Sequence, residues 1–290
     1  MSCLFTACDN NSTETKITDT LTSGTLTVSA DETYKPVIEE EVKVFMSTYP
    51  DTKIDVQYKP ESEAIRDYLE GKTRLILVAR PLTSQEEQYC EQNKIVPSSL
   101  AVAKDAVAVI LNKDAKDTAF SLTQLKGIIG GVFNKKYTVV FDRQGSSTLR
   151  FIKDSLMAGQ KTGTNLFAAN GNEAVVDYVV KNPDAMGFVG LSYVSDTIDS
   201  TAESFSTRIR LAGLMNDSTG EFYQPYQAYI ALKLYPLSRK LLYIKNETYP
   251  GLATGFSNFL AGDKGQLIFA HARLFPLRMN ITIRDAAINR

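Results

Sequence analysis

The fold class is decided by one stretch of this 290-residue chain, YTVVFDRQGSSTLRF at residues 137–151. Its apolar beginning, Tyr137 to Phe141, predicts a short strand. After a glycine-led turn, Leu149, Ile152 and Leu156 recur at helical spacing and predict a helix with one apolar face. A strand that passes directly into a helix is typical of an α/β protein.

The turn between this strand and helix has the chemistry of an anion site. Ser146, Ser147 and Thr148 stand where a helix leaves backbone N–H groups unpaired. Those donors, the positive end of the helix dipole and the hydroxyl groups can together hold an oxyanion. Arg143, two residues before Gly145, offers a positive charge. The alternative is that Ser146 only caps the helix.

The composition is that of a folded protein with room for two domains. Hydrophobic residues make up 43% and charged residues 22% of the chain, which excludes disordered and fibrous classes. There are 32 basic and 33 acidic residues, for a net charge of −1. Because no basic patch is visible, we expect no nucleic-acid partner and no polybasic membrane contact.

The chain is poor in the residues of catalytic and metal sites. Its one histidine, His271, lies near the C-terminus, and no CxxC or HExxH motif is present. A Ser-His-Asp triad would need His271, and a zinc site with several His or Cys ligands is not available. We therefore expect a structural or surface His271, no catalytic residues, no metal and no cofactor. Cys3, Cys8 and Cys90 imply no disulfide framework.

The N-terminus is similar to the end of a bacterial lipoprotein signal. Leu4 to Cys8 is an apolar and small-residue stretch before a cysteine that would be lipidated, and a polar spacer at residues 9–20 follows. Only seven residues precede Cys8, so we expect a start codon upstream of Met1; the alternative is a chance similarity. Residues 1–23 are predicted to be a signal remnant and tether. No other run approaches the length of a membrane span.

Strands and helices alternate along the rest of the chain. The sequence predicts strands at residues 25–30, 53–58, 74–79, 137–141, 187–190, 229–234 and 241–245, and a strand pair or one bent strand at 101–112. It predicts helices at 36–49, 62–69, 84–93, 121–129, 173–180, 251–260 and 265–272, and a loop at 195–207. This alternation predicts parallel sheets with helices on both faces.

Several separated motifs, in this order, resemble one family. They are LTVS at residues 26–29 with Thr33-Tyr34, AKDAVAV at 103–109, GSST at 145–148, GFVG at 187–190 and the most distinctive, YPLSR at 235–239. The chain resembles the phosphate-binding component of bacterial ABC phosphate importers, among the type II periplasmic binding proteins. The likeness spans about residues 24–276.

The resemblance implies a two-lobed α/β fold in which one anion binds between the lobes. Each lobe would be a mainly parallel sheet flanked by helices, and the chain would cross between lobes twice. Lobe 1 would comprise residues 24–112 and 229–290, and lobe 2 residues 113–228. Carried over by motif, the implied anion-binding residues are Thr33, Tyr34, Ser62, Arg80, Ser146, Ser147 and Thr148.

Two positions depart from the family pattern. Where the family has an aspartate before Pro-Leu, this chain has Arg80, which offers only donors and cannot accept the proton of monohydrogen phosphate. Arg80 either enters the site or pairs with Glu86 or Glu87. In place of the missing aspartate, the carboxylate that accepts the proton of monohydrogen phosphate would come from Glu32, Glu61 or Glu63.

The second departure concerns the arginine before the Ser/Thr loop. The family's arginine stands a little earlier, where this chain has Phe141. Arg143 replaces it in the site, or instead pairs with Asp142 on the surface.

The sequence therefore predicts a monomeric, non-catalytic lipoprotein of the periplasm, anchored to a bacterial membrane only by its lipid. It would capture phosphate or a related oxyanion for an ABC permease. The alternative is a sensor or scavenger lipoprotein that presents another anion, such as sulfate. A phosphate-handling hydrolase is disfavoured because neither a metal-ligand cluster nor a base is visible.

Overall fold

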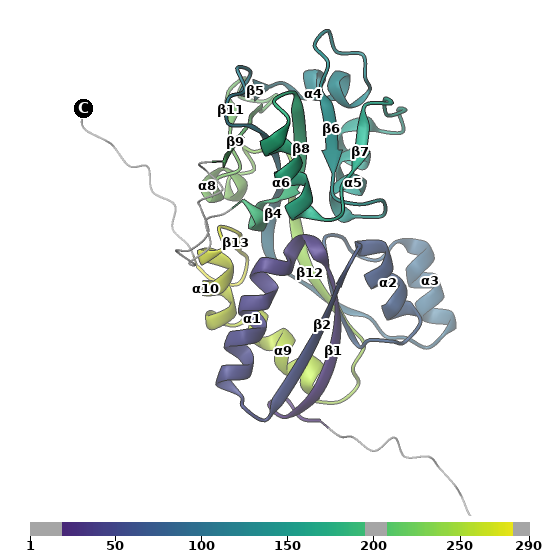
Figure 1. Ribbon diagram of the computed structural model, residues 1–290. Coiled ribbons are helices and arrows are strands. Elements are labelled where there is room, and N and C mark those ends of the chain that lie inside the picture. The colour runs from purple at the N-terminus through teal and green to yellow at the C-terminus, as the bar shows by residue number, and fades with distance from the viewer. Residues whose placement is uncertain (1–18, 195–207, 281–290) are drawn as a thin grey trace, which may run out of the picture.

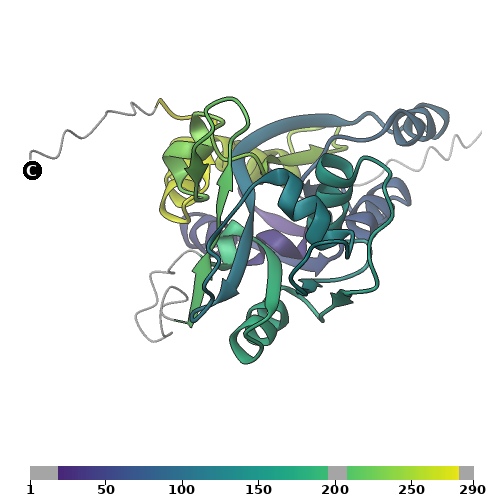
Figure 2. The ribbon, with the colours of Figure 1, turned by 90° about the horizontal axis from the view of Figure 1, so that it is seen from above.

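Two lobes stack one upon the other and are joined by strands that run through both (Figure 1). The computed structural model describes residues 19–194 and 208–280. Seen from above, lobe 2 overlies lobe 1 (Figure 2). Cys8, the polar spacer up to residue 18 and the loop expected at 195–207 lie outside the described residues.

Lobe 1 begins with two parallel strand pairings around its first strand. Its elements are β1 (Gly24–Asp31), η1 (Glu32–Tyr34), α1 (Lys35–Thr48), β2 (Thr52–Lys59), α2 (Glu61–Leu69), β3 (Leu75–Val78) and α3 (Ser84–Gln92). β1 pairs in parallel with β2 on one side and β3 on the other. Alternate residues of β3 face opposite cores: Leu75 and Leu77 pack with α1, and Ile76 and Val78 pack with α2 and α3.

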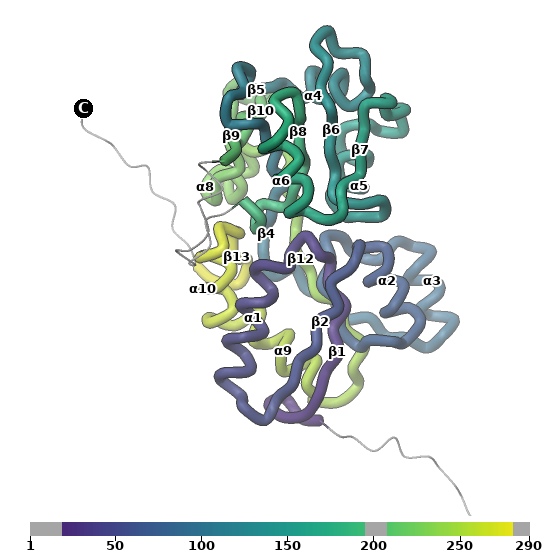
Figure 3. The backbone as a smooth tube through the Cα atoms, in the orientation of Figure 1, coloured from purple at the N-terminus to yellow at the C-terminus, as the bar shows by residue number. Residues whose placement is uncertain are grey.

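The lobes are joined by two antiparallel strands, β4 (Ser98–Asn112) and β12 (Ser238–Lys245) (Figure 3). The expected strand at 101–112 is one long strand. Its Val102 and Ala103 pack in the lobe 1 core, whereas its residues from Ala106 onward pack in the lobe 2 core. Because β4 contributes to both cores and β12 pairs with it, one sheet runs through the molecule in the order β2-β1-β3-β12-β4-β8-β6-β7.

Lobe 2 is built around strand β6 (Thr138–Phe141), which pairs in parallel with β7 (Leu166–Ala168) and β8 (Ala185–Gly190). Helix α5 (Ser147–Ile152) follows β6 and continues into a π-helical turn, η2 (Lys153–Met157). The remaining elements are β5 (Ala119–Phe120), α4 (Leu122–Ile129), α6 (Asn172–Lys181), η3 (Leu191–Tyr193), β9 (Ile209–Leu211), β10 (Gly213–Met215), β11 (Phe222–Tyr223) and α8 (Gln227–Ala231).

The chain returns to lobe 1 through β12. It then forms α9 (Leu252–Ala261), α10 (Asp263–His271) and β13 (Phe275–Pro276). The Phe45 ring of α1 meets the rings of Phe256 and Phe259 at 5.2 and 5.3 Å between centroids. The C-terminal helices therefore share the apolar core of the first helix.

Most of the predicted strands and helices are confirmed, and one is wrong. Residues 229–234 form no strand: α8 ends at Ala231 and a turn follows, with Lys233 at φ +60°. In α8 only Ile230 is buried, so the run has one inward position and lacks the alternation of a half-buried strand. His271 is exposed at the end of α10.

The predicted lobe boundaries, at residues 112 and 229, stay a prediction; β4, which ends at Asn112, has residues in both cores. Within residues 19–194 and 208–280, no helix has the length and apolar character needed to cross a membrane.

Candidate anion-binding site

Buried polar side chains gather where the two lobes meet. They come from the end of β1, the starts of α2, α5 and α6, the region after β8, and the crossing strands; they are Asp31, Glu32, Thr33, Glu61, Asp105, Asp142, Ser146, Ser147, Thr148, Asn172, Ser192 and Arg239. We call this set the interlobe cluster. Since buried polar groups need partners, its hydrogen bonds show what it can bind.

Arg239, near the start of β12, is the central cation of the cluster. Its side chain is 1% exposed. Its Nε donates to Asp105 Oδ2 at 2.8 Å, and its Nη1 donates to Ser147 Oγ at 2.9 Å. The guanidinium also lies 5.2 Å from the centre of the Tyr34 ring. Its Nη2 has no hydrogen-bond partner, so one strong donor is uncommitted.

The three hydroxyl residues at the start of α5 have different roles. Ser146 is the helix cap: its Oγ accepts from the Leu149 N–H at 3.2 Å and donates to Asp142 Oδ1 at 2.5 Å. Ser147 turns toward lobe 1, where its Oγ lies 3.3 Å from Thr33 Oγ1. Thr148 Oγ1 is buried without a partner. Thr148 therefore adds a second uncommitted group.

Asp31 contributes an uncommitted acceptor. It ends β1, is fully buried, and its Oδ1 accepts from the Thr33 N–H at 3.1 Å. Its Oδ2 has no partner. Burial and the charge of Glu61 raise the pKa of Asp31 to about 7, against the opposing effects of Arg239 and the Ser147 hydroxyl.

Donors and acceptors without hydrogen-bond partners thus belong to one buried cluster. A buried polar group without a partner costs about 1–3 kcal/mol, and five such atoms belong to this cluster: Arg239 Nη2, Thr148 Oγ1, Asp31 Oδ2, Glu32 Oε1 and Asp105 Oδ1. A small oxyanion offers acceptor oxygens to the first two, and an acidic hydroxyl of the anion offers a proton to the third.

Ion pairs and hydrogen bonds connect the two lobes around the cluster. Glu61 of α2 accepts from Arg150 Nε of α5 at 2.6 Å and from the Ala79 N–H at 2.8 Å. Glu32 Oε1 lies 3.3 Å from Arg143 Nε. Two further bonds reach the backbone of η1, Ser192 Oγ to Thr33 O and Tyr193 OH to Glu32 O, both at 2.9 Å.

Comparison with known proteins places the chain in a family. The model of the PBP superfamily domain matches residues 15–264. The chain belongs to the PBP superfamily. This membership and the two-lobed α/β architecture confirm the fold expected from the resemblance.

Relatives of this PBP superfamily member include the phosphate-binding protein PstS of Staphylococcus haemolyticus. It is 23% identical over 249 residues, which cover 81% of this chain and 75% of the relative. A Clostridium perfringens protein, described as a phosphate ABC transporter substrate-binding protein and solved with bound phosphate, superposes with a TM-score of 0.74. It is 21% identical, and the match covers 88% of this chain and 100% of that one. An ABC-type phosphate transport receptor from Vibrio cholerae gives a TM-score of 0.66 at 18% identity, with coverage of 88% and 100%.

The structure brings some of the residues expected from the PBP resemblance into the interlobe cluster. Thr33, Ser147 and Thr148 lie in it. Tyr34 lies beneath it, with its ring against Arg239 and its OH 3.4 Å from the Lys240 carbonyl oxygen, to which it donates. Ser146 is buried there too, but both of its hydroxyl bonds are internal, as the capping alternative requires.

The other expected residues lie at the edge of the cluster, and the two arginines among them are paired with carboxylates. Ser62 is exposed, and its N–H donates to the Gly145 carbonyl at 3.4 Å. Arg80 donates twice to Glu86, at 2.7 and 2.8 Å, so the pairing alternative with Glu86 is the one observed. Arg143 pairs with Glu32 of the other lobe, a partner not considered for it from sequence.

The sequence did not indicate Arg239, Asp105 and Asp31 as site residues of this PBP superfamily member. Arg239 is the last residue of the YPLSR motif, which indicated the family without indicating a role. Asp105 is an isolated carboxylate in an otherwise apolar buried strand, a pattern that calls for a buried cation.

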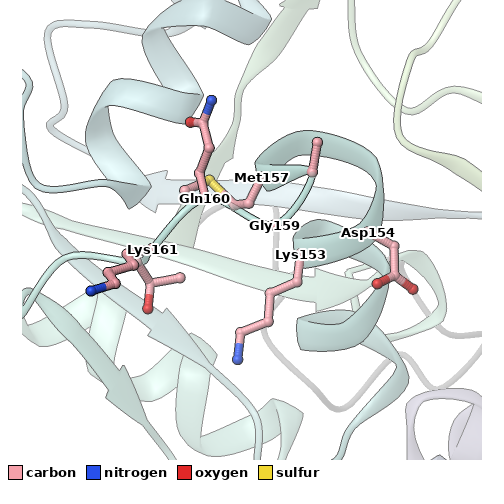
Figure 4. Close-up of a pocket in the computed structure, with 8 residues that line it drawn as sticks. Lys153, Asp154, Met157, Gly159, Gln160 and Lys161 are labelled. Atoms are coloured by element: carbon pink, nitrogen blue, oxygen red, sulfur yellow. The ribbon is translucent and has the colours of Figure 1, made fainter.

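A separate pocket of about 680 Å³ lies beyond the end of α5 (Figure 4). It is lined by Lys153, Asp154, Met157, Ala158, Gly159, Gln160, Lys161 and Thr162. No residue of the interlobe cluster lines it. Asp154 accepts a hydrogen bond from Arg150 Nη1 at 3.2 Å, and Arg150 in turn pairs with Glu61 of the cluster.

Proposed function

We propose that this protein is an extracytoplasmic binding protein that holds phosphate, or a related oxyanion, in the interlobe cluster and delivers it to an ABC importer. One observation carries the proposal: Arg239 Nη2, Thr148 Oγ1 and Asp31 Oδ2 are buried together and lack partners. Charge-assisted donors in a buried site, where the effective dielectric is low, bind an oxyanion strongly. The names of the PstS relatives agree with this ligand class.

The same proposal includes the site's opening and closing. Residues from both lobes make the cluster, so an anion enters only when the lobes part, and the interlobe ion pairs form as they meet. The protein would act as a monomer, tethered outside the cytoplasm by a lipid on Cys8, and would dock on a permease in that membrane.

Calorimetric titration of the ligand-stripped protein with phosphate and with sulfate, near neutral pH, tests the proposal. We expect one saturable phosphate site and a rise in melting temperature with phosphate. The absence of both effects with either anion would contradict an oxyanion-binding function. Tight sulfate binding with weak phosphate binding would instead support the alternative of a sulfate sensor or scavenger.

Thr148→Ala is expected to weaken phosphate binding about 10- to 100-fold, because it removes a hydrogen bond to a charged ligand worth roughly 1–3 kcal/mol. Calorimetry measures the change. Thr148→Ser is the matched control, since it keeps Oγ, and should bind nearly as the parent does. Equal affinity of both variants and the parent would remove Thr148 from the site.

Gly190→Ala is expected to weaken phosphate binding about tenfold or more by holding the lobes apart, an overpacking cost of roughly 1–3 kcal/mol. A Cβ on Gly190 of β8 would lie 2.2 Å from Thr33 Cγ2 and 3.0 Å from Thr33 O, across the lobe contact. No polar group is lost. The control is Gly213→Ala, whose nearest neighbour atom would be at an ordinary 3.5 Å. Calorimetric titration of both variants with phosphate checks this. Equal affinities would show that Thr33 moves away from the added Cβ at little cost.

A further inference from the structure

The pocket beyond the end of α5 is a recess that the proposed anion site does not use (Figure 4). It is anchored from below, because Leu156 and Met157 of η2 pack in the lobe 2 core. The π-helical turn ends at Ala158 with φ +43°, in the left-handed region that residues other than glycine rarely adopt. Irregular turns of this kind are frequent at functional sites, and this one borders a cavity of about 680 Å³.

The lining of this pocket carries uncommitted positive charge. Lys153 and Lys161 line it, and Asp154 is the one acidic residue among the described residues that do so. Within residues 19–194 and 208–280, the amino groups of the two lysines have no hydrogen-bond or salt-bridge partner. Figure 4 shows both amino groups extending to the same side of the turn. Two free ammonium groups beside one recess are suited to a carboxylate.

One wall of the pocket is connected to lobe 1. Asp154 is 65% exposed and accepts from Arg150 Nη1 at 3.2 Å. The same guanidinium donates through Nε to Glu61 Oε2 at 2.6 Å and through Nη2 to Glu61 Oε1 at 3.4 Å. Glu61 belongs to α2 of lobe 1, and its side chain is 2% exposed. Arg150 is therefore shared between the pocket and an ion pair that joins the lobes.

We propose, on the basis of the function proposed above, that this pocket is a docking site for an acidic side chain of the ABC importer. The incoming carboxylate pairs with the ammonium groups of Lys153 and Lys161. The importer thus recognises lobe 2 at a place separate from the interlobe cluster, so docking and anion binding use different residues.

The choice of occupant rests on charge and on place. Anionic lipid surfaces are recognised by clusters of about four to eight basic residues, whereas two ammonium groups at a recess fit one carboxylate. The proposed function requires an importer that contacts the closed protein and then lets the lobes part. A carboxylate in the pocket competes with Glu61 for Arg150, so a contact there acts directly on lobe closure.

The test compares radiolabelled phosphate uptake by cells that depend on this chain with phosphate binding by the purified full chain. Lys153→Glu combined with Lys161→Glu should lower the initial uptake rate tenfold or more, because the pocket then repels a carboxylate. The Kd for phosphate, measured by calorimetry, should stay within twofold of the parent value. Arginine at both positions keeps the charge and should keep the uptake rate.

The matched control is Lys136→Glu combined with Lys181→Glu. It makes the same change of charge at two exposed lysines of lobe 2 that do not line the pocket, and its uptake rate should equal that of the parent. An unchanged uptake rate in the pocket variant overturns the docking site. An equal loss in the control also overturns it, since the net charge of the protein would then decide.

Three further outcomes assign the pocket or the function differently. A second phosphate equivalent bound by the parent and lost in the pocket variant would make the pocket a phosphate site. Parent binding to phosphatidylglycerol vesicles that the pocket variant lacks would make it a lipid contact. Either result overturns docking of the importer there. Failure of the parent to bind phosphate at all overturns the proposed function itself, whereas lost uptake with retained phosphate binding supports the docking site.

Discussion

Replacement of Arg239 by methionine is expected to abolish phosphate binding and to lower the free energy of unfolding by about 3–5 kcal/mol. The variant removes the guanidinium that donates to Asp105 and Ser147 and whose Nη2 is free for the anion. It also leaves the fully buried Asp105 carboxylate without its cation. Urea unfolding and calorimetric titration measure the two losses.

The double variant Arg239→Met with Asp105→Leu separates binding from folding. Since replacement of a whole buried ion pair by apolar residues is often neutral or stabilising, this protein should recover most of the parent's unfolding free energy. It should still fail to bind phosphate. Phosphate binding by the double variant would show that Arg239 holds the lobes together without contacting the ligand.

The second large effect is expected at Glu41 of α1, outside the site. This carboxyl is fully buried, and neither of its oxygens has a hydrogen-bond partner. Burial, with a smaller effect from Glu40, raises the pKa of Glu41 to about 10. The folded protein therefore keeps the proton at neutral pH, whereas the unfolded chain releases it above pH 4.5. Stability contributed by this group is present at acidic pH and is lost as the pH rises toward 10.

From pH 4.5 to pH 7.5, the free energy of unfolding of the parent is expected to fall by roughly 3–4 kcal/mol relative to that of Glu41→Gln, since one pKa unit corresponds to about 1.36 kcal/mol. Urea unfolding at both pH values measures this. The control Glu39→Gln changes an exposed carboxyl on the same helix and should follow the parent. If the parent and Glu41→Gln respond equally to pH, the Glu41 carboxyl is reached by solvent.

The fold could be predicted because the sequence patterns that indicate it are local and recur along the chain. Alternating strand and helix periodicities define the βα units, and the hydroxyl-rich start of α5 is a helix end whose chemistry depends on its neighbours in sequence. Ser147 and Thr148 are buried at that position, and their part in anion binding stays a prediction.

The centre of the candidate site was not predictable in the same way. Arg239 and Asp105 are 134 positions apart and meet because β12 pairs with β4. Sequence periodicity does not fix such pairings. Arg80 was ambiguous for a different reason, because its role depends on which carboxylate is nearer. Glu86 is held close by the capping box that Thr83 makes at the start of α3, so this partner could have been inferred from local sequence.

The place of Arg239 on a crossing strand implies an order of events during capture. The chain leaves the lobe 2 core at Leu237 and enters the lobe 1 core at Leu241, so Arg239 lies at the pivot between them. When one rigid body rotates against another, atoms near the pivot travel least, while Ser147 and Thr148 travel with lobe 2. An anion would first contact Arg239 and Asp31, which stay in place, and the hydroxyls of α5 would contact it when lobe 2 closes. The rate of association and the rate of dissociation would then depend on different lobes.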